Sequence, residues 1–133
     1  MNNVYDETLL ELYRNPLNKK IIADATHHHR EHNPLCGDII ELFLKIDKNR
    51  IIDSGFQGSG CVMSDVGASL LTETIKGKTL PELRAITATS LLETLHLEHL
   101  NPTRIRCVTL AWEGLKKLLP EVSMSIDKTI IER

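Results

Sequence analysis

The stretch of sequence that decides the fold is residues 38–56, which read DIIELFLKIDKNRIIDSGF. Ile, Leu and Phe are frequent in both halves of this stretch, as they are in strands that bury one face. Between the halves, Asp47-Lys48-Asn49 is typical of a tight turn. Residues 38–47 and 50–56 are therefore predicted to form an antiparallel hairpin.

Outside this hairpin the sequence predicts one more extended segment and four helices. Residues 21–29 are expected to be extended and to lead into a turn at 32–34, and Gly55, Gly58 and Gly60 are expected to close the strand region. Apolar residues at helical spacing predict helices over residues 5–13, 61–75, 80–100 and 105–119, with a capping box at Thr79–Glu82, a stop at Pro120 and some β character in the tail beyond it. The expected fold class is α+β, with a small antiparallel sheet of about three strands and helices packed on it.

The composition is that of one globular domain. The chain has 133 residues, of which 41% are hydrophobic and 26% charged. No apolar run exceeds three residues, whereas a membrane helix needs about 18. A formal net charge of −2 and only five aromatic side chains argue against nucleic acid or an anionic membrane as the partner. The first residues show no secretory signal pattern, so the cytoplasm is the expected location.

Three cysteines are the residues most in need of an explanation, because an odd number cannot all pair within one chain. Cys36 lies in the stretch NPLCGD, and in an extended segment its side chain and that of Asp38 project to the same side. Cys61 follows Gly58-Ser59-Gly60 in the first turn of a predicted helix, where the positive end of the helix dipole favours a thiolate. Thiolates and a carboxylate are thus expected to converge.

Cys107 is expected in the first turn or two of the last helix, beside Arg104 and Arg106, where dipole and cations again favour a thiolate. Three thiolates and one carboxylate match a tetrahedral site for a borderline-soft metal such as zinc. The spacing contains no Cys-x-x-Cys pair, however, and free cysteine is among the most buried residue types. Taken alone, the residues leave two interpretations open: metal ligands, or three small buried hydrophobic side chains.

Four blocks of sequence carry a resemblance to a known family: YRNPLN at 13–18, NPLCGD at 33–38, GSGCVMS at 58–64 and RIRCVTLAWEGL at 104–115. In this order they resemble the NifU-like (IscU/SufU) family of iron–sulfur cluster assembly proteins. The resemblance covers most of residues 5–119. It implies a single domain over residues 1–133, of the NifU-like N-terminal type, with the three cysteines gathered at one end of a small antiparallel sheet.

The residue before the third cysteine favours one branch of this family. The IscU branch has a histidine there, whereas this chain has Arg106, which is similar to the SufU branch. SufU-like proteins usually also carry an insertion between the second and third cysteines, and this chain lacks it. The SufU branch binds zinc tightly through its three cysteines and its aspartate, so the resemblance implies a set of zinc ligands made of Cys36, Asp38, Cys61 and Cys107.

The resemblance implies a zinc-dependent sulfurtransferase that accepts persulfide sulfur from a SufS-like, pyridoxal-phosphate-dependent cysteine desulfurase. Cys36 would be the catalytic acceptor, released when a histidine of the desulfurase takes its place on zinc, and downstream cluster assembly proteins would receive the sulfur. One alternative is an IscU-type scaffold, on which a transient [2Fe–2S] cluster is assembled and handed on. A second alternative is a structural zinc domain that serves as an interaction module.

Four of the six histidines lie within residues 27–32, just before Cys36. An accessory metal-loading patch is one interpretation of this cluster. An exposed strand edge or loop is the favoured one, because neighbouring side chains of an extended segment alternate between faces. These histidines are not included among the ligands. Trp112 continues the apolar periodicity of the last helix and is expected in the core.

Overall fold

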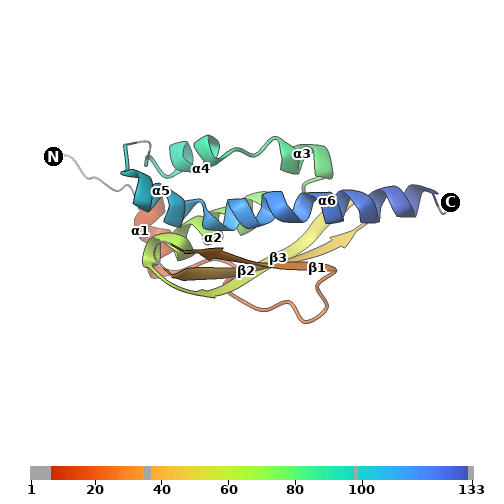
Figure 1. The fold of residues 1–133 in the computed structure, drawn as a ribbon, viewed down its shortest axis with the longest axis horizontal. Helices are drawn as coiled ribbons and strands as arrows, with labels where there is room; N and C mark the ends of the chain where they lie inside the picture. Colours follow the sequence, from red (N-terminus) through yellow and green to blue (C-terminus); the bar gives the residue numbers. More distant parts are fainter. Residues whose placement is uncertain (1–6, 35–36, 98, 132–133) are drawn as a thin grey trace.

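The structure is a computed structural model, which describes residues 7–34, 37–97 and 99–131. For residues 123–131 it describes the helical backbone alone. Its elements run in the order α1, three strands and five further helices (Figure 1). Among the described residues, no helix is both long enough and apolar enough to cross a membrane.

Three antiparallel strands form one sheet in the order β1-β2-β3. They are β1 (His27–Asn33), β2 (Asp38–Asp47) and β3 (Arg50–Ser59). Lys48 and Asn49 join β2 to β3 and have φ angles of 52° and 65°, the left-handed conformation that a two-residue hairpin turn requires. The hairpin expected from residues 38–56 is therefore confirmed.

The first strand differs from the expectation. Residues 21–26 are not in a strand, and β1 instead takes in the whole histidine cluster and part of the expected turn at 32–34. It pairs with β2 from His27↔Leu44 to Asn33↔Asp38. Pairing with an apolar neighbour, and not the residues' own β propensity, accounts for this strand. The third strand is also longer than expected, because it continues through Gly55 and Gly58 to Ser59.

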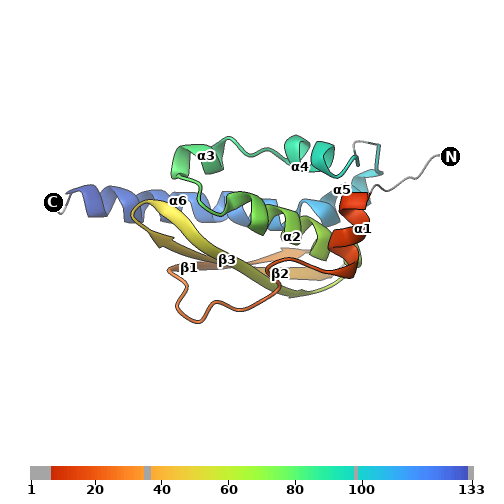
Figure 2. The ribbon, with the colours of Figure 1, turned by 180° about the vertical axis from the view of Figure 1, so that it is seen from behind.

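Within the described residues, six helices accompany the sheet: α1 (Glu7–Arg14), α2 (Val62–Ile75), α3 (Leu80–Arg84), α4 (Ala88–Thr94), α5 (Pro102–Val108) and α6 (Leu110–Ile131). Helices α2 and α6 lie on one face of the sheet, and α3 and α4 lie beyond them (Figures 1 and 2). Residues 18–20 lie along the edge of β3, where Lys19 forms a bridge with Phe56. The core between the sheet and these helices contains Leu42, Leu44, Phe56, Leu71 and Leu115, all nearly inaccessible to solvent. The expected α+β class, with helices packed on an antiparallel sheet, is confirmed.

The helix expected over residues 80–100 is two helices. The predicted capping box at Thr79 and Glu82 begins α3, and a second one at Thr87 and Ser90 begins α4. This second cap stops the first helix, since Thr87 takes the extended backbone of an N-cap residue. Trp112 supports the break by donating its indole N–H to the carbonyl of Ile86 at 3.0 Å, and it packs against the core as expected.

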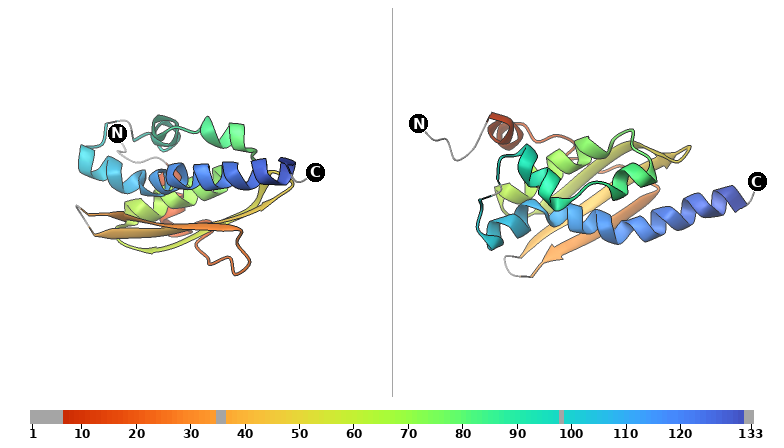
Figure 3. Two further views of the ribbon diagram at one scale, coloured as in Figure 1. Left: turned by 45° about the vertical axis from the view of Figure 1, so that its right-hand side comes forward. Right: turned by 90° about the horizontal axis from the view of Figure 1, so that it is seen from above.

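The helix expected over residues 105–119 also differs from the structure. It is divided at Thr109 into α5 and α6, and α6 continues through Pro120 to Ile131, beyond the body of the sheet (Figure 3). Pro120 is exposed, so water can bond the carbonyl of residue 116, which loses its helical donor there. Val122 is buried in the core, which favours continuing the helix past the proline. The expected stop, and the β character of the tail, were wrong.

Candidate metal centre

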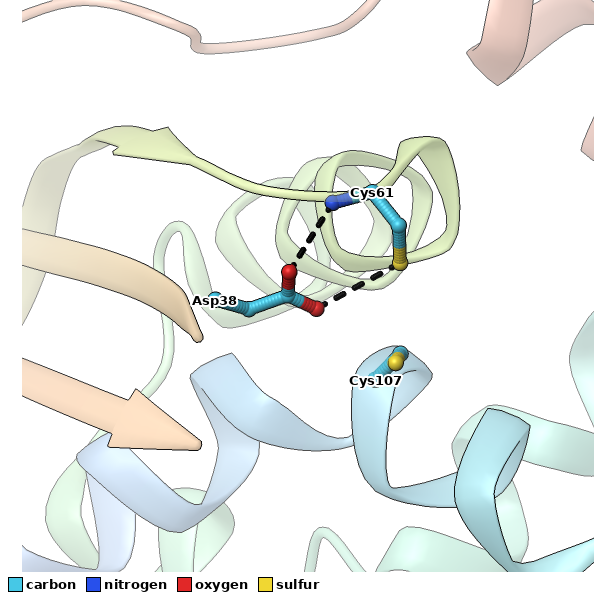
Figure 4. A group of neighbouring side chains, drawn as sticks. All are labelled: Asp38, Cys61 and Cys107. Atoms are coloured by element: carbon cyan, nitrogen blue, oxygen red, sulfur yellow. Dashed lines mark hydrogen bonds between the residues drawn. The ribbon is translucent and has the colours of Figure 1, made fainter. Parts of the chain in front are cut away.

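Asp38, Cys61 and Cys107 meet at the end of the sheet where β2 begins (Figure 4). One ligand atom from each of these side chains lies within 4.8 Å of the other two. Asp38 and Cys107 are buried, with 3% and 4% of their surfaces exposed, whereas Cys61 is partly exposed. The three residues come from a strand, the start of one helix and the end of another, so tertiary packing alone brings them together.

Asp38 is held by groups at the start of α2. The backbone N–H of Cys61 donates to Asp38 Oδ1 at 3.0 Å, and the Cys61 thiol donates to Oδ2 at 3.4 Å (Figure 4). The hydroxyl of Ser64 donates to the same Oδ2 at 2.7 Å. Gly60 makes this approach possible, because a Cβ atom there would overlap the Asp38 carboxylate. The carboxylate is thus fixed through both oxygens.

Cys61 is the N-cap residue of α2, with φ −80° and ψ 161°. It therefore lies at the N-terminal end of this helix, as the sequence predicted, although its thiol makes no capping hydrogen bond. Cys107 does not lie where it was expected. It is the second-last residue of α5, and α6 begins after it at Leu110. Cys107 is therefore not at the N-terminal end of either helix.

Close packing of α2 against α5 places Cys107 beside Cys61. The contact centres on Gly67 of α2, where a Cβ atom would overlap the backbone carbonyl of Val108. Only glycine permits the helix backbones to come this close. Val108 follows Cys107 directly, so the glycine determines how near the second thiol comes to the first.

The donor set fits zinc or an iron–sulfur cluster. Thiolates suit both, and a carboxylate completes some zinc sites. Ligands about 2.0–2.3 Å from a tetrahedral ion are about 3.3–3.8 Å apart, and the 3.4 Å between Cys61 Sγ and Asp38 Oδ2 lies within this range. Cys36, the fourth expected ligand, lies outside the described residues. Its place in the site remains a prediction.

Ser64 is the residue at this site that sequence reasoning missed. It is 1% exposed and lies close to Asp38 Oδ2 and, at 3.6 Å, to Cys61 Sγ. The sequence does contain a local signal for this residue. Ser64 is the third residue after an N-cap, a position whose polar side chain often bonds back towards the cap.

Two hollows open beside the centre. A mostly apolar groove of about 540 Å³ is lined by Leu10, Tyr13 and Val62, among others, with Cys61 and Arg104 at its edge. A smaller hollow of about 240 Å³ lies between β1 and the α5–α6 junction and includes Arg106. The two arginines expected beside Cys107 therefore line different hollows.

The histidine cluster lies on β1, at the edge of the sheet. Its side chains alternate between partly buried and exposed, as expected for a strand. His29 bonds Glu31 at 2.8 Å, and no histidine within the described ranges joins a group of three potential metal ligands. The strand-edge interpretation of the cluster is confirmed.

Residues 4–125 match the family described as the NifU-like N terminal domain. The chain belongs to this family. Its relatives include the zinc-dependent sulfurtransferase SufU of Bacillus subtilis, 32% identical over 133 aligned positions that cover 88% of this chain and 90% of that protein. They also include the iron–sulfur cluster assembly scaffold protein IscU of Haemophilus influenzae, 34% identical over 123 positions that cover 88% of this chain and 94% of that protein.

Solved structures agree on the fold of this NifU-like domain. A putative scaffold protein for the SUF system from Fervidobacterium islandicum superposes with a TM-score of 0.73 at 23% identity, covering 87% of this chain and 96% of that one. A NifU-like protein from Brucella abortus gives 0.72 at 16% identity, covering 90% and 94%. The chain is an iron–sulfur cluster assembly protein of the IscU/SufU kind. The identities to SufU and IscU are too similar to separate the two branches.

Proposed function

We propose that this protein is a SufU-like, zinc-dependent sulfurtransferase, which accepts persulfide sulfur from a pyridoxal-phosphate-dependent cysteine desulfurase. The observation that carries the proposal is the meeting of Asp38, Cys61 and Cys107 within 4.8 Å. Cys36 stands two residues before Asp38 and completes a set of four ligands. Arg106, in place of a histidine before Cys107, favours sulfur transfer over cluster building.

The residues of this site have separate tasks in the proposed reaction. Bound zinc would supply the positive charge that keeps the cysteines as thiolates at neutral pH. The Cys36 thiolate attacks the outer sulfur of the desulfurase persulfide. A new S–S bond forms on Cys36, the S–S bond of the donor breaks, and the donor cysteine leaves as a thiolate that takes up a proton.

The two described cysteines of this set are poorly suited to accept sulfur, which leaves Cys36 as the proposed acceptor. Cys107 is buried in α5, and Cys61 is tied to Asp38 through both its N–H and its thiol. Cys36 lies between the end of β1 and the start of β2, and Gly37 beside it has a φ of 75°.

The partner in this proposal is a SufS-like desulfurase, with downstream cluster assembly proteins as the recipients of the sulfur. The groove beside Cys61 offers apolar surface close to the site. Among the described residues, Cys61 and Cys107 are not joined in a disulfide, as is usual for cysteines in reducing compartments. We therefore place the reaction in the cytoplasm.

A scaffold function is the second candidate, and the IscU proteins support it because one is 34% identical to this chain. In that function the same ligands would hold a [2Fe–2S] cluster as cargo, and the single carboxylate would make the cluster easier to hand on. The two candidates differ in the material that the site carries. They share the ligand set.

Purification without oxygen, followed by a desulfurase assay, separates the candidates. Sulfur transfer predicts colourless protein with one zinc per chain and faster alanine release by the desulfurase in its presence. Cys36→Ser is expected to stay folded and to lose the stimulation. Brown protein with iron and sulfide, and no stimulation of the desulfurase, would favour the scaffold. Unfolding of Cys36→Ser would favour a structural zinc domain.

A further inference from the structure

Ser64 has no part in the function proposed above, yet it makes the shortest hydrogen bond that the structure records to Asp38. Its hydroxyl donates to Asp38 Oδ2 at 2.7 Å, and 1% of its surface is exposed. It lies in the first turn of α2, which also carries Cys61 as its N-cap. Ser64 therefore lies next to two of the proposed ligands without being one itself.

The two oxygens of Asp38 have different surroundings. Oδ1 accepts the backbone N–H of Cys61 at 3.0 Å, whereas Oδ2 lies 3.4 Å from Cys61 Sγ, the spacing of two ligands on one tetrahedral ion. Oδ2 is thus the oxygen that faces the sulfurs. The Ser64 hydroxyl donates to this same oxygen at 2.7 Å.

We propose that Ser64 is a positioning residue of the metal centre, which fixes the Asp38 carboxylate with Oδ2 facing Cys61 and Cys107. Rotation of the carboxylate about its Cβ–Cγ bond would break the bond from Ser64 to Oδ2 and the bond from Cys61 N–H to Oδ1 together. Without the hydroxyl, one of these two restraints is gone. The inference rests on the proposed metal site, and it holds whether that site carries zinc for sulfur transfer or a cluster as cargo.

Zinc affinity of the full chain, measured by competition with a chromophoric chelator under anaerobic conditions, tests the proposal. Loss of a residue that orients a metal ligand typically lowers metal affinity about 10–100-fold, and we expect Ser64→Ala to fall in this range. Ser64→Thr keeps the hydroxyl and is expected to restore most of the affinity.

Ser69→Ala is the matched control. Ser69 is also a fully buried serine of α2, but its hydroxyl has no hydrogen-bond partner among the described residues. Its loss is expected to leave zinc affinity unchanged.

A comparison in the Asp38→Ala background separates positioning from a structural role. If Ser64 acts through Asp38, adding Ser64→Ala to Asp38→Ala changes zinc affinity little. The absorption spectrum of the Co²⁺-loaded protein gives a second readout. It is expected to change in Ser64→Ala and to stay the same in Ser69→Ala.

Three results would overturn the inference. Equal losses of affinity from Ser64→Ala with and without Asp38 would mean that the serine acts through packing. Unchanged affinity of Ser64→Ala, with zinc bound normally by the unsubstituted protein, would overturn this inference alone. No zinc or cobalt binding by the unsubstituted protein would overturn the metal site and this inference together.

Discussion

Asp38 is a carboxylate almost fully withdrawn from solvent, and its surroundings explain how the fold tolerates it. Burying a carboxylate is costly unless hydrogen bonds or a counter-ion replace its water. Here a backbone N–H, a hydroxyl and a thiol surround the two oxygens. The N–H and the thiol both belong to Cys61, which is itself a proposed ligand. The bonds that stabilise the carboxylate therefore also direct it towards the metal centre.

Gly60 provides a test of this arrangement at the level of one residue. A Cβ atom at Gly60 would overlap the Asp38 side chain, so Gly60→Ala is expected to push the carboxylate away from Cys61. Overpacking of this kind costs about 1–3 kcal/mol of unfolding free energy. Zinc affinity is expected to fall with it. Chemical denaturation and chelator competition measure the two effects.

Gly114→Ala is the control for this substitution. A Cβ atom at Gly114 of α6 would meet its neighbours at 3.4 Å and 3.5 Å, which is ordinary contact, and alanine favours a helix by up to about 1 kcal/mol. We expect this variant to bind zinc normally. Normal zinc binding by Gly60→Ala as well would contradict the close approach at Asp38.

At the level of elements, the packing of α2 against α5 determines how the two described cysteines meet. Cys61 begins α2 and Cys107 lies near the end of α5. At Gly67, α2 comes so close to the backbone of α5 that a Cβ atom would overlap the Val108 carbonyl. The separation of the two thiols is therefore a property of a helix pair.

Gly67→Ala should separate these helices. Its Cβ atom would overlap the Val108 carbonyl, so α5 must shift and carry Cys107 with it. We expect unfolding free energy to fall by about 1–3 kcal/mol and zinc affinity to fall as well. Gly114→Ala again serves as the control. Retention of both stability and affinity by Gly67→Ala would contradict the described packing.

A second pair of elements, β1 and α6, is joined by an ion pair between buried Glu31 and exposed Lys117. Glu31 of β1 accepts hydrogen bonds from Lys117 at 2.7 Å and from His29 at 2.8 Å. Burial by itself would raise the pKa of Glu31, but these two bonds outweigh it and hold the pKa below its usual 4.5. The same pair raises the pKa of Lys117. Ionised Glu31 therefore stabilises the fold.

The pH dependence of this ion pair follows from the lowered pKa of Glu31. Its stabilising contribution is complete above pH 4.5, the usual value, and is lost as the pH falls through the lower folded-state pKa. Urea denaturation should therefore show Glu31→Gln less stable than the unsubstituted protein at pH 7. The difference should shrink as the solution is acidified below pH 4.5. A difference that stays constant over this range would contradict the proposed role.

At the scale of the whole molecule, local signals predicted most of the fold. The apolar hairpin with its turn, the helix after Cys61 and the capping box at Thr79 each depend on neighbouring residues, and each is confirmed. The failures depend on distant ones. β1 is a strand because β2 pairs with it, and α6 passes Pro120 because Val122 enters the core.

The sequence likewise predicted some residues of the candidate site and missed others. The sequence identified Asp38, Cys61 and Cys107 by residue type and by the family resemblance, and the structure brings them together. It did not single out Ser64, because the position after the N-cap is a local signal, whereas the importance of Ser64 comes from a bond across 26 positions of the chain. Nor could it place Cys107 at the end of a helix, because the break at Thr109 interrupts a regular apolar pattern.

The central claim is that Cys36 accepts sulfur at a zinc centre formed with Asp38, Cys61 and Cys107. The most direct test is peptide mass spectrometry of the zinc-loaded protein after anaerobic incubation with a cysteine desulfurase and L-cysteine. The account predicts one added sulfur on the peptide that contains Cys36, and none in Cys36→Ser. Sulfur on Cys61 or Cys107 with Cys36 unmodified, or no added sulfur while the desulfurase turns over normally, would contradict it.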